Sequence, residues 1–254
     1  MSKDKAPQAG KDGTLTFVGH LSELRQRLLK SLIALIITTG VSLAFADRIL
    51  HVLMAPAGNT NFVFIEMTEM IGVYMKVSLA SGIVLAMPYL VYQLLMFVSP
   101  ALTPREKKYV YLILPWITLM FIGGVAFGYF VLAPPALHFL TTFGSNIATP
   151  QIKISNYVSL ISRLLIAIGA VFETPVIITF LSRLGIVTAK TLASKRRHAI
   201  VFAFVLGAII TPTFDPVNQS LVAVPLIVLY EISIWLARLF QRREAREVTP
   251  APSP

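Results

Sequence analysis

The stretch that decides the fold is VSLASGIVLAMPYLVYQLLMFV, residues 77–98. It runs for 22 residues without a charged side chain, and about 20 apolar residues are enough for a helix to cross the hydrocarbon core of a bilayer. Pro88 lies in its interior, where a membrane helix tolerates proline better than a soluble helix does. We therefore expect a membrane-spanning helix here.

The composition of the rest of the chain agrees with this expectation. Of the 254 residues, 56% are apolar and only 13% are charged, whereas about a quarter are charged in a soluble domain. A soluble enzyme, a nucleic-acid-binding module and a disordered protein are therefore all disfavoured, in spite of the net charge of +10. The chain has no cysteine, which excludes disulfides and thiolate metal sites.

Five further apolar segments have the character of membrane helices. The last two are short and are joined by the tight link Thr211–Pro216, so we expect a hairpin whose first arm is too short to cross an unthinned bilayer. The sequence thus predicts an all-α integral membrane protein with six transmembrane helices: Leu28–Ala46, Val77–Val98, Tyr109–Leu132, Tyr157–Leu184, Ala199–Ile210 and Val217–Leu236.

The distribution of charge predicts the orientation. Six spans place both termini on one side, and the segments on that side contain all but four of the 22 lysines and arginines; the exceptions are Arg48, Lys76, Lys153 and Arg163. Because cytoplasmic loops are rich in these residues, both termini should be cytoplasmic. We expect a flexible N-terminus (1–16), a membrane domain (17–240) and a disordered tail (241–254).

Motifs for enzymatic chemistry are missing from the sequence. It has no GxGxxG, Walker A, HExxH or GxSxG pattern, and its four histidines lie far apart. We expect neither an enzyme nor a bound metal or cofactor.

Glu173 lies near the middle of the fourth predicted span, two residues before Pro175. A carboxylate at membrane depth is costly and usually faces a cavity, a partner or a substrate path. The alternative is a carboxyl group that only satisfies a neighbour within the bundle. Pairing with Arg163 is unfavourable, since ten residues separate the two by about 15 Å along a helix.

Two other carboxylates have a structural and a functional interpretation. Glu23 lies four residues before Arg27 on a predicted amphipathic helix, which by itself indicates a surface ion pair. Glu106 follows Thr103 and Pro104 in a pattern typical of a capping box. The functional interpretation of both residues depends on a family resemblance.

Several short motifs follow one another along the chain: HLSELRQR (20–27), MPYLVYQ (87–93), FVSPAL (97–102), REKK (105–108), FETP (172–175) and TPTFDPVNQ (211–219). With these motifs in this order, the chain resembles the TatC family, the receptor subunit of the twin-arginine protein translocase. The similarity runs from about Phe17 to Arg238, with Thr103 and Met96 at positions where the family commonly has aromatic residues.

The resemblance implies a function in protein export. TatC proteins recognise the twin-arginine signal peptides of folded cargo and act with the single-span partners TatA and TatB, using the protonmotive force. It implies a multi-pass protein of the bacterial cytoplasmic membrane, in an oligomeric complex, that binds no nucleic acid. The signal-peptide site would comprise Glu23, Arg25, Arg27 and Glu106.

In the hairpin, Thr211, Asp215 and Gln219 would contact a partner subunit; the alternative is that Thr211 and Asp215 only cap helices and form the turn. A rival function is a secondary transporter that couples protons at Glu173. Such transporters often consist of two related halves, and this sequence has no internal repeat. A third class, a purely structural membrane scaffold, would bind neither signal peptide nor solute.

Overall fold

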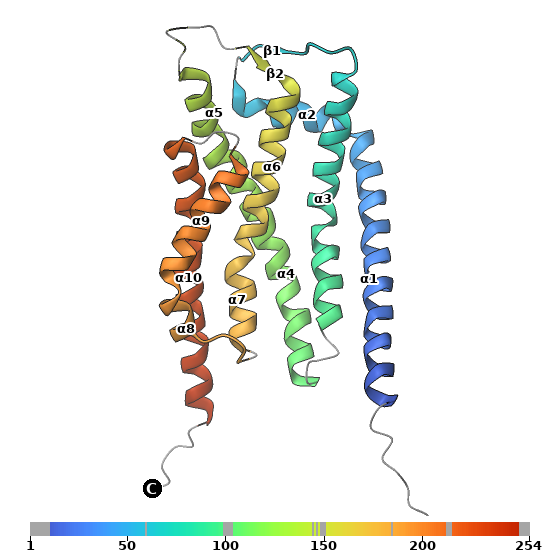
Figure 1. Cartoon of the computed structure of the whole chain (residues 1–254), viewed down its shortest axis with the longest axis vertical. Coiled ribbons are helices and arrows are strands. Elements are labelled where there is room, and N and C mark those ends of the chain that lie inside the picture. The colour runs from blue at the N-terminus through green and yellow to red at the C-terminus, as the bar shows by residue number, and fades with distance from the viewer. Residues whose placement is uncertain are drawn as a thin grey trace, which may run out of the picture.

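The computed structural model describes residues 11–58, 60–98, 104–143, 145, 147, 151–183, 185–211 and 215–248. This part of the chain is mostly helical and also contains one pair of very short strands (Figure 1). The elements are α1 (Lys11–Ala44), α2 (Ala46–Met54), η1 (Ala55–Ala57), β1 (Phe62–Val63), α3 (Glu69–Val98), α4 (Pro104–Phe127), η3 (Gly128–Leu132), α5 (Ala133–Thr142), β2 (Ile152–Lys153), α6 (Ile154–Phe172), α7 (Thr174–Arg183), α8 (Ala189–Ser194), α9 (Arg196–Ile210) and α10 (Pro216–Val248).

Five helical segments of the described chain are long and apolar enough to cross a membrane: Leu21–Ala44, Glu69–Phe97, Leu112–Thr142, Ile154–Arg183 and Pro216–Leu239. They correspond to five of the six predicted spans. The remaining predicted span lies in α9, which has 15 residues and a length of about 22 Å, less than the roughly 30 Å of a bilayer core. The all-helical membrane fold is therefore confirmed with five candidate spans.

Both ends of the described chain lie at the same end of the bundle, at the bottom of Figure 1. The helices extend past the predicted domain boundaries, because α1 begins at Lys11 and α10 continues to Val248. The remaining parts of the two predicted flexible termini, 1–10 and 249–254, lie outside the described residues.

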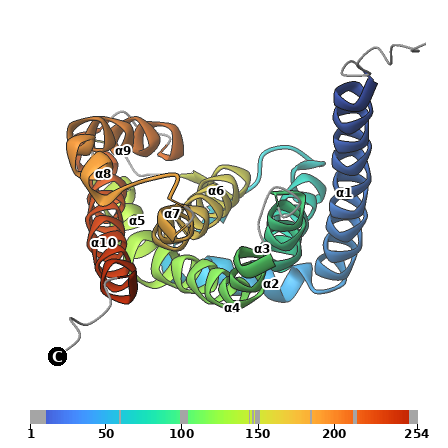
Figure 2. The same cartoon turned by 90° about the horizontal axis from the view of Figure 1, so that it is seen from below.

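Seen from below, the helices form an open arc with α1 at one tip and α9 and α10 at the other (Figure 2). The centre is α6, where Val158, Ile161 and Ile168 are at most 1% exposed. By contrast, only 6% of the candidate span in α1 is buried, since this helix packs mainly on α3. A Cβ on Gly82 would lie 2.8 Å from the Cα of Thr39, so glycine permits this close approach of the two helices.

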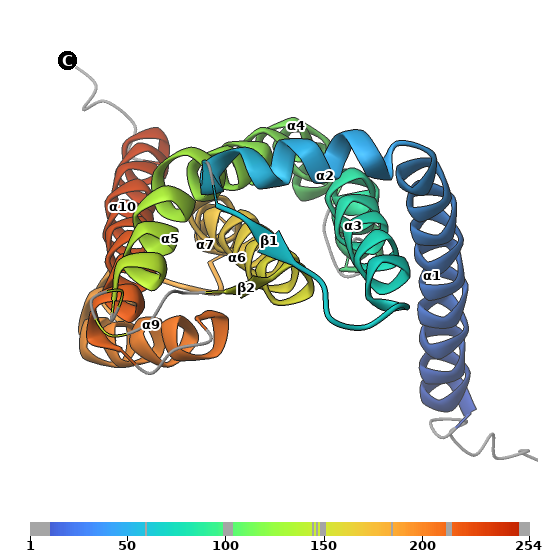
Figure 3. The same cartoon turned by 90° about the horizontal axis from the view of Figure 1, so that it is seen from above.

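At the opposite end, α2 lies across the bundle beside the parallel pair β1 and β2 (Figure 3). Two tyrosine hydroxyls fix α2, as Tyr157 donates to the carbonyl of Leu53 and Tyr129 to that of Val52, both at 2.6 Å. The C-terminal end of α2 is thereby anchored to α6 and η3.

Proline explains two irregularities in the spans. The third predicted span ends at Leu132, but the helix continues through the π-helical turn η3 to Thr142. Pro134 and Pro135 lack the N–H groups that would bond the carbonyls four residues earlier, so the hydrogen-bond pattern shifts without ending the helix. Pro175 similarly accompanies the break between α6 and α7 at Glu173.

Candidate functional site

The first predicted site residue, Glu23, belongs to a polar cluster between α1 and α3. Arg27 donates to Glu23 Oε1 through Nε at 2.9 Å and through Nη2 at 2.5 Å. The same guanidinium donates through Nη1 to Oε1 of Gln93, at 3.3 Å. We call Glu23, Arg27 and Gln93 the α1–α3 cluster. It confirms the predicted ion pair and adds a partner 66 residues away in the sequence.

The α1–α3 cluster is sheltered but accessible. The side chains of Arg27 and Glu23 are 20% and 28% exposed, and Gln93 is buried. Because Gln93 accepts from Arg27, the guanidinium is held in place by two helices. This holds the carboxylate of Glu23 on α1, the helix that starts at the end of the bundle where both termini lie (Figure 1).

Two other predicted residues of this site belong to α1 and α4. Arg25 is exposed on α1. Glu106 lies in the first turn of α4, which begins at Pro104 and starts at the same end of the bundle (Figure 1). The side chain of Glu106, and all of Thr103, fall outside the described residues, so the capping box is not described. The structure thus brings Glu23 and Arg27 together, and it places the backbone of Glu106 in the first turn of a helix that starts at the same end of the bundle as α1.

The chemistry of the α1–α3 cluster suits cationic ligands. A carboxylate offers a fork of two oxygens that matches the planar guanidinium. Arg27 already forms a charge-assisted contact with this carboxylate, in which two of its N–H groups donate to the single oxygen Oε1. An arginine from another molecule can therefore bind here by adding to Arg27 or by displacing it. A lysine cannot reproduce that geometry.

Glu173 lies at the break between α6 and α7, where its carbonyl accepts from the N–H groups of Val176 and Ile177. It is 3% exposed, and Oε1 is buried without a hydrogen-bond partner among the described residues. No ion pair joins it to Arg163, which is exposed on α6, in the described part of the chain. For this oxygen, nothing therefore supports the interpretation that Glu173 only forms a hydrogen bond with a neighbour inside the bundle.

The residues of the hairpin make contacts within the chain. The hydroxyl of Thr211 donates to the carbonyl of Gly207 at 2.8 Å, and Asp215 Oδ2 accepts from the N–H of Asn218 at 2.8 Å, as an N-cap does. Gln219 Nε2 donates to the carbonyl of Phe204 at 2.8 Å, which ties α10 to α9. These bonds agree with the capping interpretation. A partner contact for Thr211, Asp215 and Gln219 stays a prediction.

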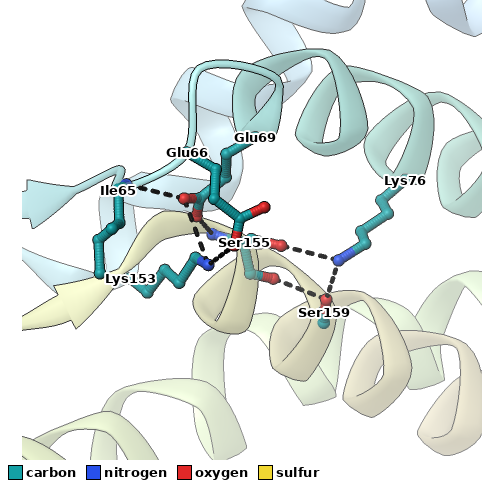
Figure 4. A network of polar contacts seen from close by, with 7 residues as sticks. All are labelled: Ile65, Glu66, Glu69, Lys76, Lys153, Ser155 and Ser159. Atoms are coloured by element: carbon teal, nitrogen blue, oxygen red, sulfur yellow. Dashed lines mark hydrogen bonds and ion pairs between the residues drawn. The ribbon is translucent and has the colours of Figure 1, made fainter.

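A polar network that the sequence analysis missed fastens the loop before α3 to the start of α6 (Figure 4). The buried carboxylate of Glu69 accepts from the N–H groups of Ile65 and Ser155, at 3.0 and 3.2 Å. Lys153 Nζ lies 3.0 Å from Glu66 and 3.6 Å from Glu69. The hydrogen bond to Glu66 holds the pKa of Lys153 above its ordinary value, and the charges of both carboxylates act in the same direction.

Two further contacts join segments far apart in the sequence. Lys76 donates to the hydroxyls of Ser155 and Ser159, at 2.8 and 3.0 Å, which links α3 to α6. Arg196 and Glu231 form a bidentate pair at 2.6 and 2.9 Å between α9 and α10. The sequence offered no local signal for these pairs, since their members are 35 to 83 residues apart. Among the residues that the structure describes, no three His, Asp or Glu side chains gather as a metal site would require.

Comparison with known proteins identifies the family. The family model "Sec-independent protein translocase protein (TatC)" matches residues 19–225. A TatC protein of Carboxydothermus hydrogenoformans is 35% identical over 92% of this chain and 97% of its own length. For a TatC protein of Aquifex aeolicus the values are 38%, 89% and 95%.

A solved structure with the same architecture agrees with this match. The crystal structure of a twin-arginine translocase receptor, TatC, superposes with a TM-score of 0.79 at 39% sequence identity. The superposition covers 87% of this chain and 98% of that one. With five candidate membrane spans and this similarity in sequence and structure, the chain belongs to the TatC family of Sec-independent protein translocase proteins.

Proposed function

We propose that this protein is the signal-peptide receptor of a twin-arginine translocase. Glu23 and Glu106 bind the arginine pair of the peptide, and Arg25 and Arg27 belong to the same patch. The observation that carries this proposal is the α1–α3 cluster, in which Glu23 already holds a guanidinium on α1, the helix that starts at the end of the bundle where α4 begins. The family match supports the same function.

The cluster also suggests how the site discriminates among ligands. Arg27 neutralises Glu23 in the free protein, so a weakly binding cation gains little by entering. A twin-arginine segment brings two guanidinium groups, which can engage Glu23 and Glu106 together. Fork-to-fork pairing then favours arginine over lysine at both positions.

In this proposal the protein lies in the bacterial cytoplasmic membrane with both termini in the cytoplasm. The common position of the two ends supports an even number of crossings, with α9 as a short sixth span in a locally thinned bilayer. TatA and TatB are the partners, the protonmotive force drives transport, and the subunits form an oligomeric complex. Glu173, Thr211, Asp215 and Gln219 are the candidate contacts with those partners.

The test is binding of a fluorescent twin-arginine peptide to the purified protein, beside the same peptide with two lysines. We expect Glu23→Gln to weaken binding of the arginine peptide about tenfold or more, since a hydrogen bond to a charged group contributes about 1.5–3 kcal/mol and 1.4 kcal/mol is a factor of ten. Glu231→Gln is the matched control, because it removes an ion-paired carboxylate from α10 and leaves α1 intact.

The outcomes separate recognition from structure. Recognition predicts that Glu106→Gln also weakens binding, whereas a pure capping role tolerates it, because glutamine fits a capping box. Equal affinity for the arginine and lysine peptides, or equal loss in Glu23→Gln and Glu231→Gln, would contradict the proposal.

A further inference from the structure

An apolar groove runs between α4, α7 and α10, away from the α1–α3 cluster. Its volume is about 340 Å³. Figure 2 looks along these helices from the end that carries the termini and shows α7 between α4 and α10. Apolar side chains of all three helices line the groove, among them Leu112, Trp116, Met120, Phe180 and Leu236.

One end of this groove is cationic. Arg183 is the last residue of α7 and the one charged side chain among the described residues that line the groove. It is half-buried and has an interaction of its own within the chain. A guanidinium carries five N–H donors, so it can keep that contact and still present donors to a ligand. The groove thus combines an apolar slot with a fixed positive charge at its mouth.

The position of the groove in the bundle indicates which ligand fits it. Its walls belong to three candidate spans, and Leu112 on its α4 wall is 62% exposed, so acyl chains of a surrounding bilayer can reach it. Trp116 is 56% exposed, and tryptophan is enriched where membrane helices meet the headgroup layer. Basic pockets between membrane helices on the cytoplasmic side are typical binding sites for anionic headgroups. A ligand with an acyl chain and a phosphate matches both parts of the groove.

We propose that this groove binds one anionic phospholipid from the leaflet at the end that carries the termini. The phosphate lies against Arg183, and an acyl chain lies along α4 between Leu112 and Met120. Guanidinium groups pair with phosphate oxygens in a bidentate manner, which fixes the lipid by geometry as well as by charge. A zwitterionic lipid has the same acyl chain, but its headgroup has no net charge. It is therefore attracted less strongly to Arg183 and binds more weakly.

Native mass spectrometry of the purified full chain tests this proposal by counting bound phosphatidylglycerol and phosphatidylcholine as each lipid is added. We expect the parent to retain one phosphatidylglycerol preferentially. Arg183→Gln should weaken that binding about tenfold, in line with the loss of a charge-assisted contact. Arg238→Gln, which removes an exposed arginine of α10 outside the groove lining, should bind like the parent.

A second variant tests the slot separately from the charge. Thr179 lines the groove and bonds only its own helix in the contacts described, so Thr179→Phe narrows the slot while Arg183 stays. It should weaken the binding of both lipids about equally, in protein that elutes as a single folded species. The proposal would be overturned if Arg183→Gln bound phosphatidylglycerol as well as Arg238→Gln does. It would also be overturned if the parent retained the two lipids equally. Unchanged lipid binding in both groove variants, with a hydrophobic peptide bound there instead, would overturn it as well.

Discussion

Replacing Glu173 by leucine separates a structural role of this carboxyl group from a functional one. The side chain is 3% exposed, and its Oε1 has no hydrogen-bond partner among the described residues. A buried polar group without a partner costs about 1–3 kcal/mol. Leucine removes that cost and has a similar volume, so repacking should offset no more than about 1.5 kcal/mol.

We therefore expect the free energy of unfolding of Glu173→Leu to equal that of the parent or to exceed it by up to about 3 kcal/mol. Transport of a folded cargo should nevertheless fall. A polar contact between membrane helices contributes about 1–2 kcal/mol, so the loss of such a contact with a partner or a signal peptide would reduce transport about five- to thirtyfold. Binding of the twin-arginine segment should be unchanged.

The assay pairs heat-induced unfolding of the detergent-purified protein with cargo transport into membrane vesicles that contain the partner subunits. Glu69→Leu is the contrasting control. It removes a second buried carboxylate, but one that accepts hydrogen bonds from the backbone N–H groups of Ile65 and Ser155. That variant should unfold at a lower temperature. If Glu173→Leu is also destabilised, the carboxyl group has a structural role and the reasoning is wrong. A stable Glu173→Leu with full transport would refute the functional role.

The remaining predictions concern the hairpin, the network at the far end and the topology. Gly207→Ala should destabilise the protein by about 1–3 kcal/mol in thermal unfolding, because its Cβ would lie 2.9 Å from the carbonyl oxygen of Gln219; an unchanged midpoint would contradict this close packing. Lys153→Met should lower the unfolding temperature at neutral pH. The hydrogen bond to Glu66 raises the pKa of Lys153. The stability that Lys153 contributes is therefore complete below the ordinary lysine pKa of 10.5 and is lost as the pH rises through the raised pKa. The unfolding temperatures of parent and variant should become equal only in strong alkali. A reporter fused after Arg246 should be cytoplasmic and one inserted before β1 external; the same location for both would rule out the proposed topology.

Local patterns in the sequence were sufficient to predict most of the helices. An apolar run such as Val77–Val98 specifies a span by its own length and composition, and the candidate span Glu69–Phe97 contains nearly all of it. The end of the third predicted span at Leu132 was wrong, because the proline pair that follows shifts the hydrogen bonds of the helix into a π turn. Whether α9 crosses the membrane depends on the thickness of the bilayer around it, which no sequence pattern specifies.

The candidate site could be predicted only where its contacts are local. Glu23 and Arg27 are one helical turn apart, so their spacing was enough to predict the pair. Gln93 joins them from another helix, and no periodicity within α1 or α3 indicates that contact. The pairing of Glu231 with Arg196 could likewise not be predicted, because tertiary packing brings the two side chains together.

Photocrosslinking tests the central claim, recognition of twin arginines at the α1–α3 cluster, most directly. A photoreactive residue replaces Gln26, which is exposed on α1 three positions after Glu23, in the full chain within native membranes. The same residue at Arg238, exposed on α10, is the control. Recognition at this cluster predicts a crosslink from position 26 to a twin-arginine signal peptide. Excess unlabelled peptide should abolish the crosslink, and the twin-lysine peptide should not. No crosslink at position 26, or equal competition by the two peptides, would contradict it.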